Sequence, residues 1–216
     1  TFTFASAFVA TRVAMALCLE TEIQTAELLC SFERVGAAGG MRGVLLFEAY
    51  AARRLATGGE FTVKEVGSAN ETTLDVAQTL ILQKDTKTLN KTNYPVQDIK
   101  DRVVWPNPSY NRPAIDAFML LLQECIAFQM TVASNHGLDL QGTKSFLKYF
   151  DSVNRELFPE QSTPQQYSLY FVVPTDTYEK FSAKTQPITG TYGVTLNTAE
   201  ATTIGKRVKQ WIMKID

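Results

Sequence analysis

The sequence has only three cysteines and one histidine among its 216 residues. The cysteines, Cys18, Cys30 and Cys125, are odd in number and form no CxxC pair. All three lie in apolar stretches, so we expect buried free thiols rather than a disulfide framework or a zinc knuckle. The single histidine, His136, excludes a metal site built from several histidines. It is also the only histidine that a catalytic triad could use, and no GxSxG nucleophile elbow accompanies it.

No charge of either sign dominates the chain, and long apolar runs are absent from it. Lysine and arginine total 21, aspartate and glutamate total 22, and the net charge is -1. A nucleic-acid-binding protein of this composition must gather its cations on one face. No apolar stretch reaches the ~18 residues of a membrane-spanning helix, so we expect no membrane partner. The hydrophobic content of 45% is ordinary for a globular protein.

The chain begins at Thr1 and looks like a piece excised from a longer protein. Residues 2–19 superficially resemble a signal peptide, but Arg12 interrupts the apolar stretch and no basic segment precedes it. Apolar positions at helical spacing predict a helix over 4–34 instead. We therefore expect residues 1–38 to form a helical extension that packs against one globular unit, residues 39–216.

Helical and strand patterns alternate along the rest of the chain. Between a glycine-rich break at 36–43 and a polar insertion at 67–102, helical spacing predicts a helix over 44–56. Alternation and apolar runs predict strands at 60–66, 114–122, 125–132, 167–174 and 207–215. Further helices are expected at 143–157 and at 176–184, the second with Asp176 as N-cap, before a Gly/Thr loop at 185–205. This order predicts an α/β (α+β) fold, a mixed central sheet flanked by helices.

Two of the predicted strands carry polar residues in unusual places. Asp116 lies in the apolar PAIDAF, where a carboxylate is costly to bury unless it is paired, hydrogen-bonded or bound to a metal. Gln129 and Thr131 are two residues apart on the next predicted strand and so share a face. A short turn between the strands would bring all three to one face. Alternatively, Asp116 ends its strand in solvent, and Gln129 and Thr131 form the polar face of a half-buried strand.

Two further residues could carry chemistry. Glu48 lies in the middle of a predicted helix, in LLFEAY, and His136 follows a predicted strand, in TVASNHG. Each also has a purely structural explanation. Glu48 could lie on a solvated helix face, and His136 could be a loop histidine that hydrogen-bonds to the backbone.

The ordered set of motifs GVLLFE, PAIDAF, FQMTVASNHG, LYFVVPTDTYEKF and VKQWIMKI resembles the C-terminal domain of crinkler-type effectors and the related retrotransposon-hot-spot proteins. The similarity covers roughly residues 40–216 and implies a PD-(D/E)XK fold, also called the restriction-endonuclease-like fold. Glu48 matches the helix glutamate of that fold, and Asp116 matches the strand aspartate. Gln129 falls where the (D/E) belongs, and Thr131 falls where the lysine belongs.

The resemblance implies a metal-dependent nuclease in which Glu48, Asp116 and Gln129 hold Mg²⁺ or Mn²⁺. Glutamine is a neutral ligand, and threonine cannot replace an ammonium group. A lysine such as Lys64 or Lys144 would have to take its place, or His136 would act as the base. The first alternative is a catalytically degenerate nuclease fold that binds host nucleic acid or a nuclear protein. The second is a structural interaction domain with no site.

A cluster of cations beside Glu48 and Asp116 would favour nucleic acid over the other partners. Its candidate members are Arg53, Arg54, Lys64, Arg102, Arg112, Lys144 and Lys148. Crinkler-type effectors are secreted and generally act in the host nucleus, so the resemblance implies host DNA or a nuclear protein as partner. It also implies an N-terminal header, sometimes with an NTPase module, upstream of this chain.

Overall fold

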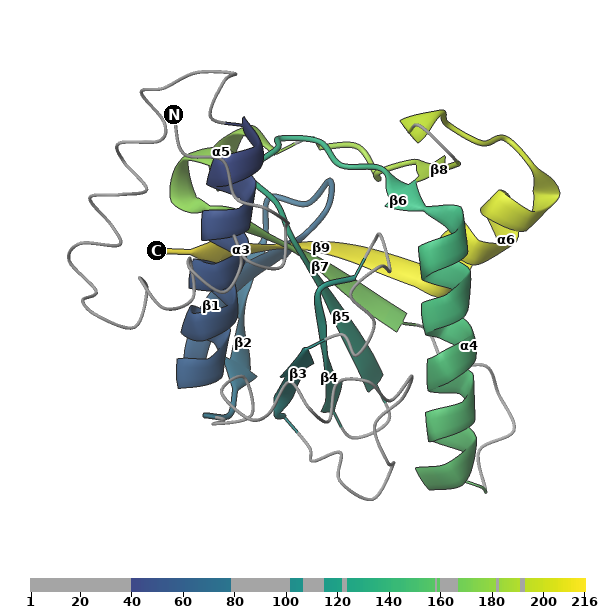
Figure 1. The fold of residues 1–216 in the computed structure, drawn as a ribbon, viewed down its shortest axis with the longest axis horizontal. Coiled ribbons are helices and arrows are strands. Elements are labelled where there is room, and N and C mark those ends of the chain that lie inside the picture. Colours follow the sequence, from purple (N-terminus) through teal and green to yellow (C-terminus); the bar gives the residue numbers. More distant parts are fainter. Residues whose placement is uncertain are drawn as a thin grey trace.

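The computed structural model describes residues 40–78, 102–106, 115–121, 124–157, 159, 167–181, 183–190 and 193–216. The helical extension predicted at 1–38 lies outside these ranges, as do Cys18 and Cys30. Within them the chain is an α/β protein with a seven-stranded mixed sheet, a two-stranded sheet and four helices (Figure 1). None of the described helices is both long and apolar enough to span a membrane.

The large sheet has the strand order β2-β1-β9-β7-β5-β4-β3. Strands β5, β7 and β9 run parallel to one another, and the other neighbouring pairs are antiparallel. The strands are β1 (Gly59–Glu65), β2 (Glu71–Val76), β3 (Val104–Pro106), β4 (Ala117–Leu121), β5 (Glu124–Met130), β7 (Tyr167–Pro174) and β9 (Val208–Ile215). The small sheet pairs β6 (Leu138–Asp139) with β8 (Ile188–Thr189) in parallel.

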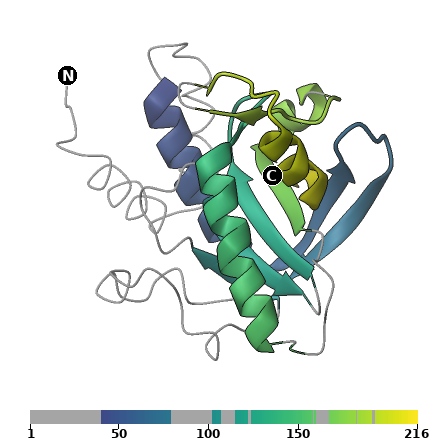
Figure 2. The ribbon, with the colours of Figure 1, turned by 90° about the vertical axis from the view of Figure 1, so that its right-hand side faces the viewer.

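Helices cover both faces of the large sheet (Figures 1 and 2). One apolar core is formed by α3 (Gly40–Thr57) and residues from all seven strands. A second core, on the opposite face, includes residues of α4 (Leu140–Leu157), α5 (Thr175–Lys180) and α6 (Ala199–Arg207). Strand β5 separates the two cores, because its side chains alternate: Ile126 and Phe128 face α3, whereas Cys125 and Ala127 face α4.

The sheet curls around α3 until its two edge strands meet at one end. The N–H of Ala77, directly after β2, donates to the carbonyl oxygen of Arg102, directly before β3, at 3.0 Å. Ala77 also forms a parallel bridge with Val103. A salt bridge of 2.9 Å between Arg102 Nη1 and Asp75 Oδ2 spans the same junction. Curling lets every strand of the sheet bury apolar side chains against one helix.

The structure confirms most of the predicted elements and corrects three of them. The predicted strand at 167–174 is present with the same ends, and the predicted helices at 44–56 and 143–157 and the other four predicted strands are present with shifted ends. Gly40 to Gly43 belong to α3 rather than to a glycine-rich break. Asp176 is not an N-cap, because α5 begins one residue earlier and its N-cap residue is Pro174. The expected loop at 185–205 contains β8 and most of α6, whose N-cap Thr198 accepts a hydrogen bond from the N–H of Ala201.

Candidate functional site

Two acidic side chains meet where α3 packs over the β4–β5 hairpin. Phe47, Ala51 and Leu55, spaced four residues apart, bury one stripe of α3 against the sheet. Glu48 follows Phe47 and lies half-buried at the margin of that stripe. Asp116 directly precedes β4, and its charge acts on Glu48, so the fold brings together two residues that are far apart in the sequence.

Asp116 is built into the hairpin by its backbone and its side chain. Its N–H donates to the carbonyl oxygen of Phe128 at 2.8 Å, and its Oδ2 accepts from the N–H of Met130 at 2.7 Å. Ala117 pairs with Phe128 in the register of β4 and β5, so Asp116 lies beside the carboxyl end of β5. The carboxylate therefore takes over a backbone donor at the place where the two strands stop pairing.

Burial makes both carboxylates poor acids. Desolvation, and after it the charge of Asp116, raise the pKa of Glu48 to about 7. Desolvation also raises the pKa of Asp116 to about 6, although the hydrogen bond from Met130 works against the shift. Near neutral pH the pair therefore holds protons that exposed carboxyl groups would have released. A bound cation would remove the repulsion between the ionised forms.

Gln129, Thr131 and His136 form a second group. Gln129 Nε2 lies 2.7 Å from His136 Nε2, and Thr131 Oγ1 lies 3.4 Å from His136 Nδ1. Gln129 and Thr131 follow the alternation of β5 and point to the face opposite α3, where the His136 ring lies 6.5 Å from that of Phe171. The structure thus divides the predicted site residues between the two sides of β5.

His136 is held by its backbone as well as by its ring. The His136 N–H donates to Gln186 Oε1 at 2.8 Å, and the Gln186 N–H donates to Gln210 Oε1 at 2.7 Å. Gln210 Nε2 returns a hydrogen bond of 3.0 Å to the carbonyl oxygen of Gln186. Desolvation lowers the pKa of the imidazole below its ordinary value. His136 is therefore neutral near pH 7 and retains a ring nitrogen that can accept a proton.

Four of the seven predicted cations contact partners other than the carboxylate pair. Lys64 lies with its Nζ 4.0 Å from the ring centroid of Tyr178, and Lys144 forms a salt bridge of 2.5 Å with Glu200. Arg54 donates to the carbonyl oxygen of Gly58, and Arg102 pairs with Asp75. Arg112 lies outside the described residues. These four cations therefore hold different partners on different elements.

The donor set available to a metal ion is small. Among the described residues no group of three or more histidine, cysteine, aspartate or glutamate side chains is arranged to hold one. The two carboxylates of Glu48 and Asp116 are hard oxygen ligands of the kind that Mg²⁺ prefers. Gln129 Oε1 is buried and has no hydrogen-bond partner among the described atoms. The two carboxylates fit a divalent cation in chemistry, whereas Gln129 Oε1 lies on the other side of β5.

The chain matches no protein-family model, no curated protein and no solved structure. The geometry of its own residues therefore carries the functional argument.

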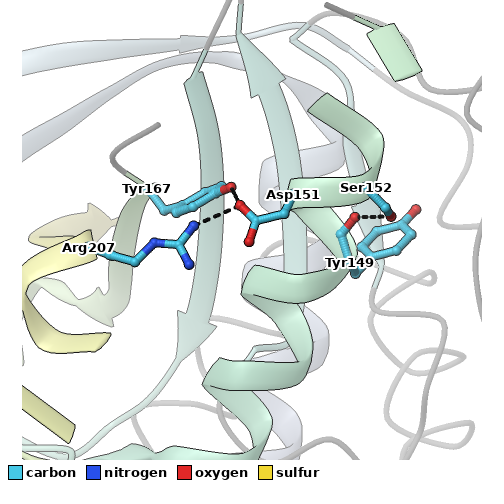
Figure 3. Close-up of polar contacts among 5 residues, drawn as sticks. All are labelled: Tyr149, Asp151, Ser152, Tyr167 and Arg207. Carbon is cyan, nitrogen blue, oxygen red and sulfur yellow. Dashed lines mark hydrogen bonds and ion pairs between the residues drawn. The ribbon is translucent and has the colours of Figure 1, made fainter. Parts of the chain in front are cut away.

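A further polar cluster, absent from the sequence predictions, ties α4, β7 and α6 together (Figure 3). Asp151 Oδ1 accepts a hydrogen bond of 2.5 Å from Tyr167 Oη and one of 2.7 Å from Arg207 Nη2. The guanidinium of Arg207 also lies 5.3 Å from the ring centroid of Tyr167. The three residues are far apart in the sequence, and no spacing rule links them. The cluster secures α6 against the sheet, and so secures the segment that contributes Gln210.

Proposed function

We propose that this chain is a crinkler-like effector domain with a restriction-endonuclease-like fold that cleaves phosphodiester bonds of host nuclear DNA with the help of Mg²⁺ or Mn²⁺. The observation that carries the proposal is the half-buried carboxylate pair of Glu48 and Asp116, in which the charge of Asp116 acts on Glu48. Two desolvated acids that repel each other destabilise a fold at neutral pH unless a cation or a proton relieves them. A pair of this kind is typical of a functional site.

The order of elements supports the proposed fold. Helix α3 carries the glutamate, and the antiparallel pair β4–β5 carries Asp116 at its beginning and Gln129 near its end. Helix α4 then returns the chain to β7, parallel to β5. The elements that carry the helix glutamate, the strand aspartate and the segment matching (D/E)XK thus follow the order that the resemblance expects, although Gln129 and Thr131 turn to the other face of β5.

The proposed metal would be held by the carboxylates of Glu48 and Asp116. Gln129, which the resemblance names as a third ligand, follows the alternation of β5 to the opposite face and would not share it. When bound, it would stabilise charge that develops at phosphorus and acidify a coordinated water. His136 supplies the remaining chemistry, because its neutral ring can accept a proton where the motif lacks its lysine. In this proposal the protein is secreted and reaches the host nucleus through segments outside this chain, such as a header or an NTPase module.

A second function, binding without cleavage, is favoured by the hydrogen bonds of Gln129 and Thr131. Both side chains contact His136, and the two candidate replacement lysines, Lys64 and Lys144, hold other partners. A nuclease fold with this substitution would bind host nucleic acid or a nuclear protein and leave the phosphodiester bond intact. The two functions share a fold and differ in one measurable step.

Cleavage of supercoiled plasmid and of single-stranded DNA with Mg²⁺ or Mn²⁺ tests the proposal. We expect metal-dependent nicking that Glu48→Gln and Asp116→Asn abolish. The matched control, Glu156→Gln, alters an exposed glutamate on α4 and should cleave like the wild type. Absence of cleavage above the Asp116→Asn background with either metal would refute the nuclease and leave the binding function.

A further inference from the structure

A groove of about 310 Å³ lies between α6, β8 and the segment that joins them, apart from the carboxylate pair. Its volume lies at the lower end of the range of small-molecule sites. Its lining includes the apolar residues Ile188, Leu196 and Ala201 and the buried residues Gln186 and Gln210. The side chain of Gln210 hydrogen-bonds to the backbone N–H and carbonyl oxygen of Gln186, so this part of the lining is preformed.

The rim of the groove carries polar side chains that have no partner in the described part of the chain. Thr185, Thr195, Asn197 and Lys206 line it, and their side chains make no hydrogen bond or ion pair with other described residues. The described lining residues include no aspartate or glutamate. One cation beside hydroxyl and carboxamide groups matches a ligand that carries one anionic group and several hydroxyls.

Gly205 leaves room for that ligand from the helix side. A β-carbon at this position would find Ile188 Cγ1 at 4.0 Å as its nearest neighbour. The rest of α6 is built from larger residues, so the missing side chain deepens the groove where Lys206 begins its rim. A larger residue at 205 would fill this space without straining the helix, since glycine is the poorest helix former after proline.

We propose that this groove binds a phosphorylated pentose, with Lys206 on the phosphate, the threonine and asparagine side chains on the sugar hydroxyls, and the apolar floor against the C–H face of the ring. The site does not depend on the carboxylate pair or on any cleavage. The same chemistry is offered by a free nucleotide and by one nucleotide of a nucleic-acid strand. Gln186 lines the groove, and its Oε1 also accepts the hydrogen bond from the His136 N–H. A ligand in the groove would therefore contact a residue that directly holds His136.

Titration calorimetry with ribose 5-phosphate, adenosine 5′-monophosphate and a short oligothymidylate tests the site in the full chain. We expect saturable binding of ribose 5-phosphate with a dissociation constant of about 1 mM or tighter, given its size. Lys206→Gln should weaken it about tenfold, as the loss of one charge-assisted hydrogen bond does. Lys148→Gln, an exposed lysine on α4, is the matched control and should bind like the wild type.

Filling the groove gives a test that does not involve charge. Gly205→Leu should abolish binding of all three probes and leave the circular dichroism spectrum unchanged, and Thr202→Tyr, at another lining residue, serves the same purpose if Gly205→Leu is unfolded. Tighter binding of the oligothymidylate identifies a nucleic-acid strand as the source, and equal binding identifies a free nucleotide. The proposal is overturned if neither ribose 5-phosphate nor the nucleotide binds, or if the groove-filling variant binds them as well as the wild type. DNA cleavage by that variant separates this outcome from failure of the proposed nuclease.

Discussion

Removing the charge of Glu48 should stabilise the protein at alkaline pH. Burial and the charge of Asp116 raise the pKa of Glu48 from 4.5 to about 7. At about 1.4 kcal/mol for each factor of ten in acid dissociation, ionising Glu48 above neutral pH costs about 3 kcal/mol if no water screens it. Glu48 is only half-buried, so we take about half of this value, 1–2 kcal/mol. For a chain of this length the expected rise in melting temperature for Glu48→Gln is about 3–6 °C at pH 8.

The same reasoning fixes the pH dependence. Between about pH 4 and pH 7 the folded protein keeps protons on Glu48 and Asp116 that the unfolded chain releases, so the free energy of unfolding falls as the pH rises through this window. Chemical denaturation from pH 4 to pH 8, without added metal, measures it. The decline should be shallower in Glu48→Gln and unchanged in Glu156→Gln. Parallel curves for the wild type and Glu48→Gln would show that folding does not raise the pKa of Glu48 and would remove the basis of the proposed site.

Four other outcomes follow from the structure. About 10 mM Mg²⁺ should raise the melting temperature of the wild type by about 3–5 °C at pH 8, as a ligand with a dissociation constant near 1 mM would, but not that of Asp116→Asn; an equal rise in both proteins contradicts the proposed ligands. Asp151→Ala leaves two donors without their acceptor and should lower the free energy of unfolding by about 2 kcal/mol in urea; a change below about 0.5 kcal/mol would mean that the cluster does not secure α6. Gly58→Ala should lower the free energy of unfolding in urea by about 3 kcal/mol, because Gly58 has a φ of 73° and an added β-carbon would stand 2.6 Å from a backbone nitrogen. Gly193→Ala is the control: Gly193 has the same φ but open space around it, so the loss should be about 1 kcal/mol. The ring protons of His136, the single histidine, should titrate in NMR spectra with a midpoint below 6.5, and a midpoint at or above that value would place the ring in water.

The sequence predicted the elements whose pattern is strong and local. Helix α4 and strands β5, β7 and β9 were predicted because their apolar residues repeat at one clear period over seven residues or more. Helix α6 was missed, since Thr202, Thr203 and Gly205 are poor helix formers and conceal a capped start at Thr198. Its signals were present as Glu200 in the first turn and two basic residues in the last.

The proximity of two candidate site residues was predicted by the resemblance rather than by a local pattern. The resemblance paired Glu48 with Asp116, and in the fold the charge of Asp116 acts on Glu48. The attachment of Gln129 and Thr131 to His136 depends on how the chain returns after β5, which no local pattern specifies. Gln186 reaches His136 across fifty residues, and the groove beside it exists only when α6 and β8 are packed. Such long-range contacts require the three-dimensional structure.

Strand β9 has a consequence for how the protein folds and for how it could be divided. It follows every other strand in the sequence, yet it lies between β1 and β7 inside the sheet. Among the described strands, β9 alone pairs with both β1 and β7, and apart from it the β1–β2 hairpin meets the rest of the sheet only at the bridge between Ala77 and Val103. Until β9 inserts, the chain therefore holds two separate half-sheets with open inner edges, each a template for pairing with another molecule. A chain truncated before Val208 would therefore contain two half-sheets without the strand between them. A peptide of residues 208–216, added in trans, would supply that strand and restore the continuous sheet.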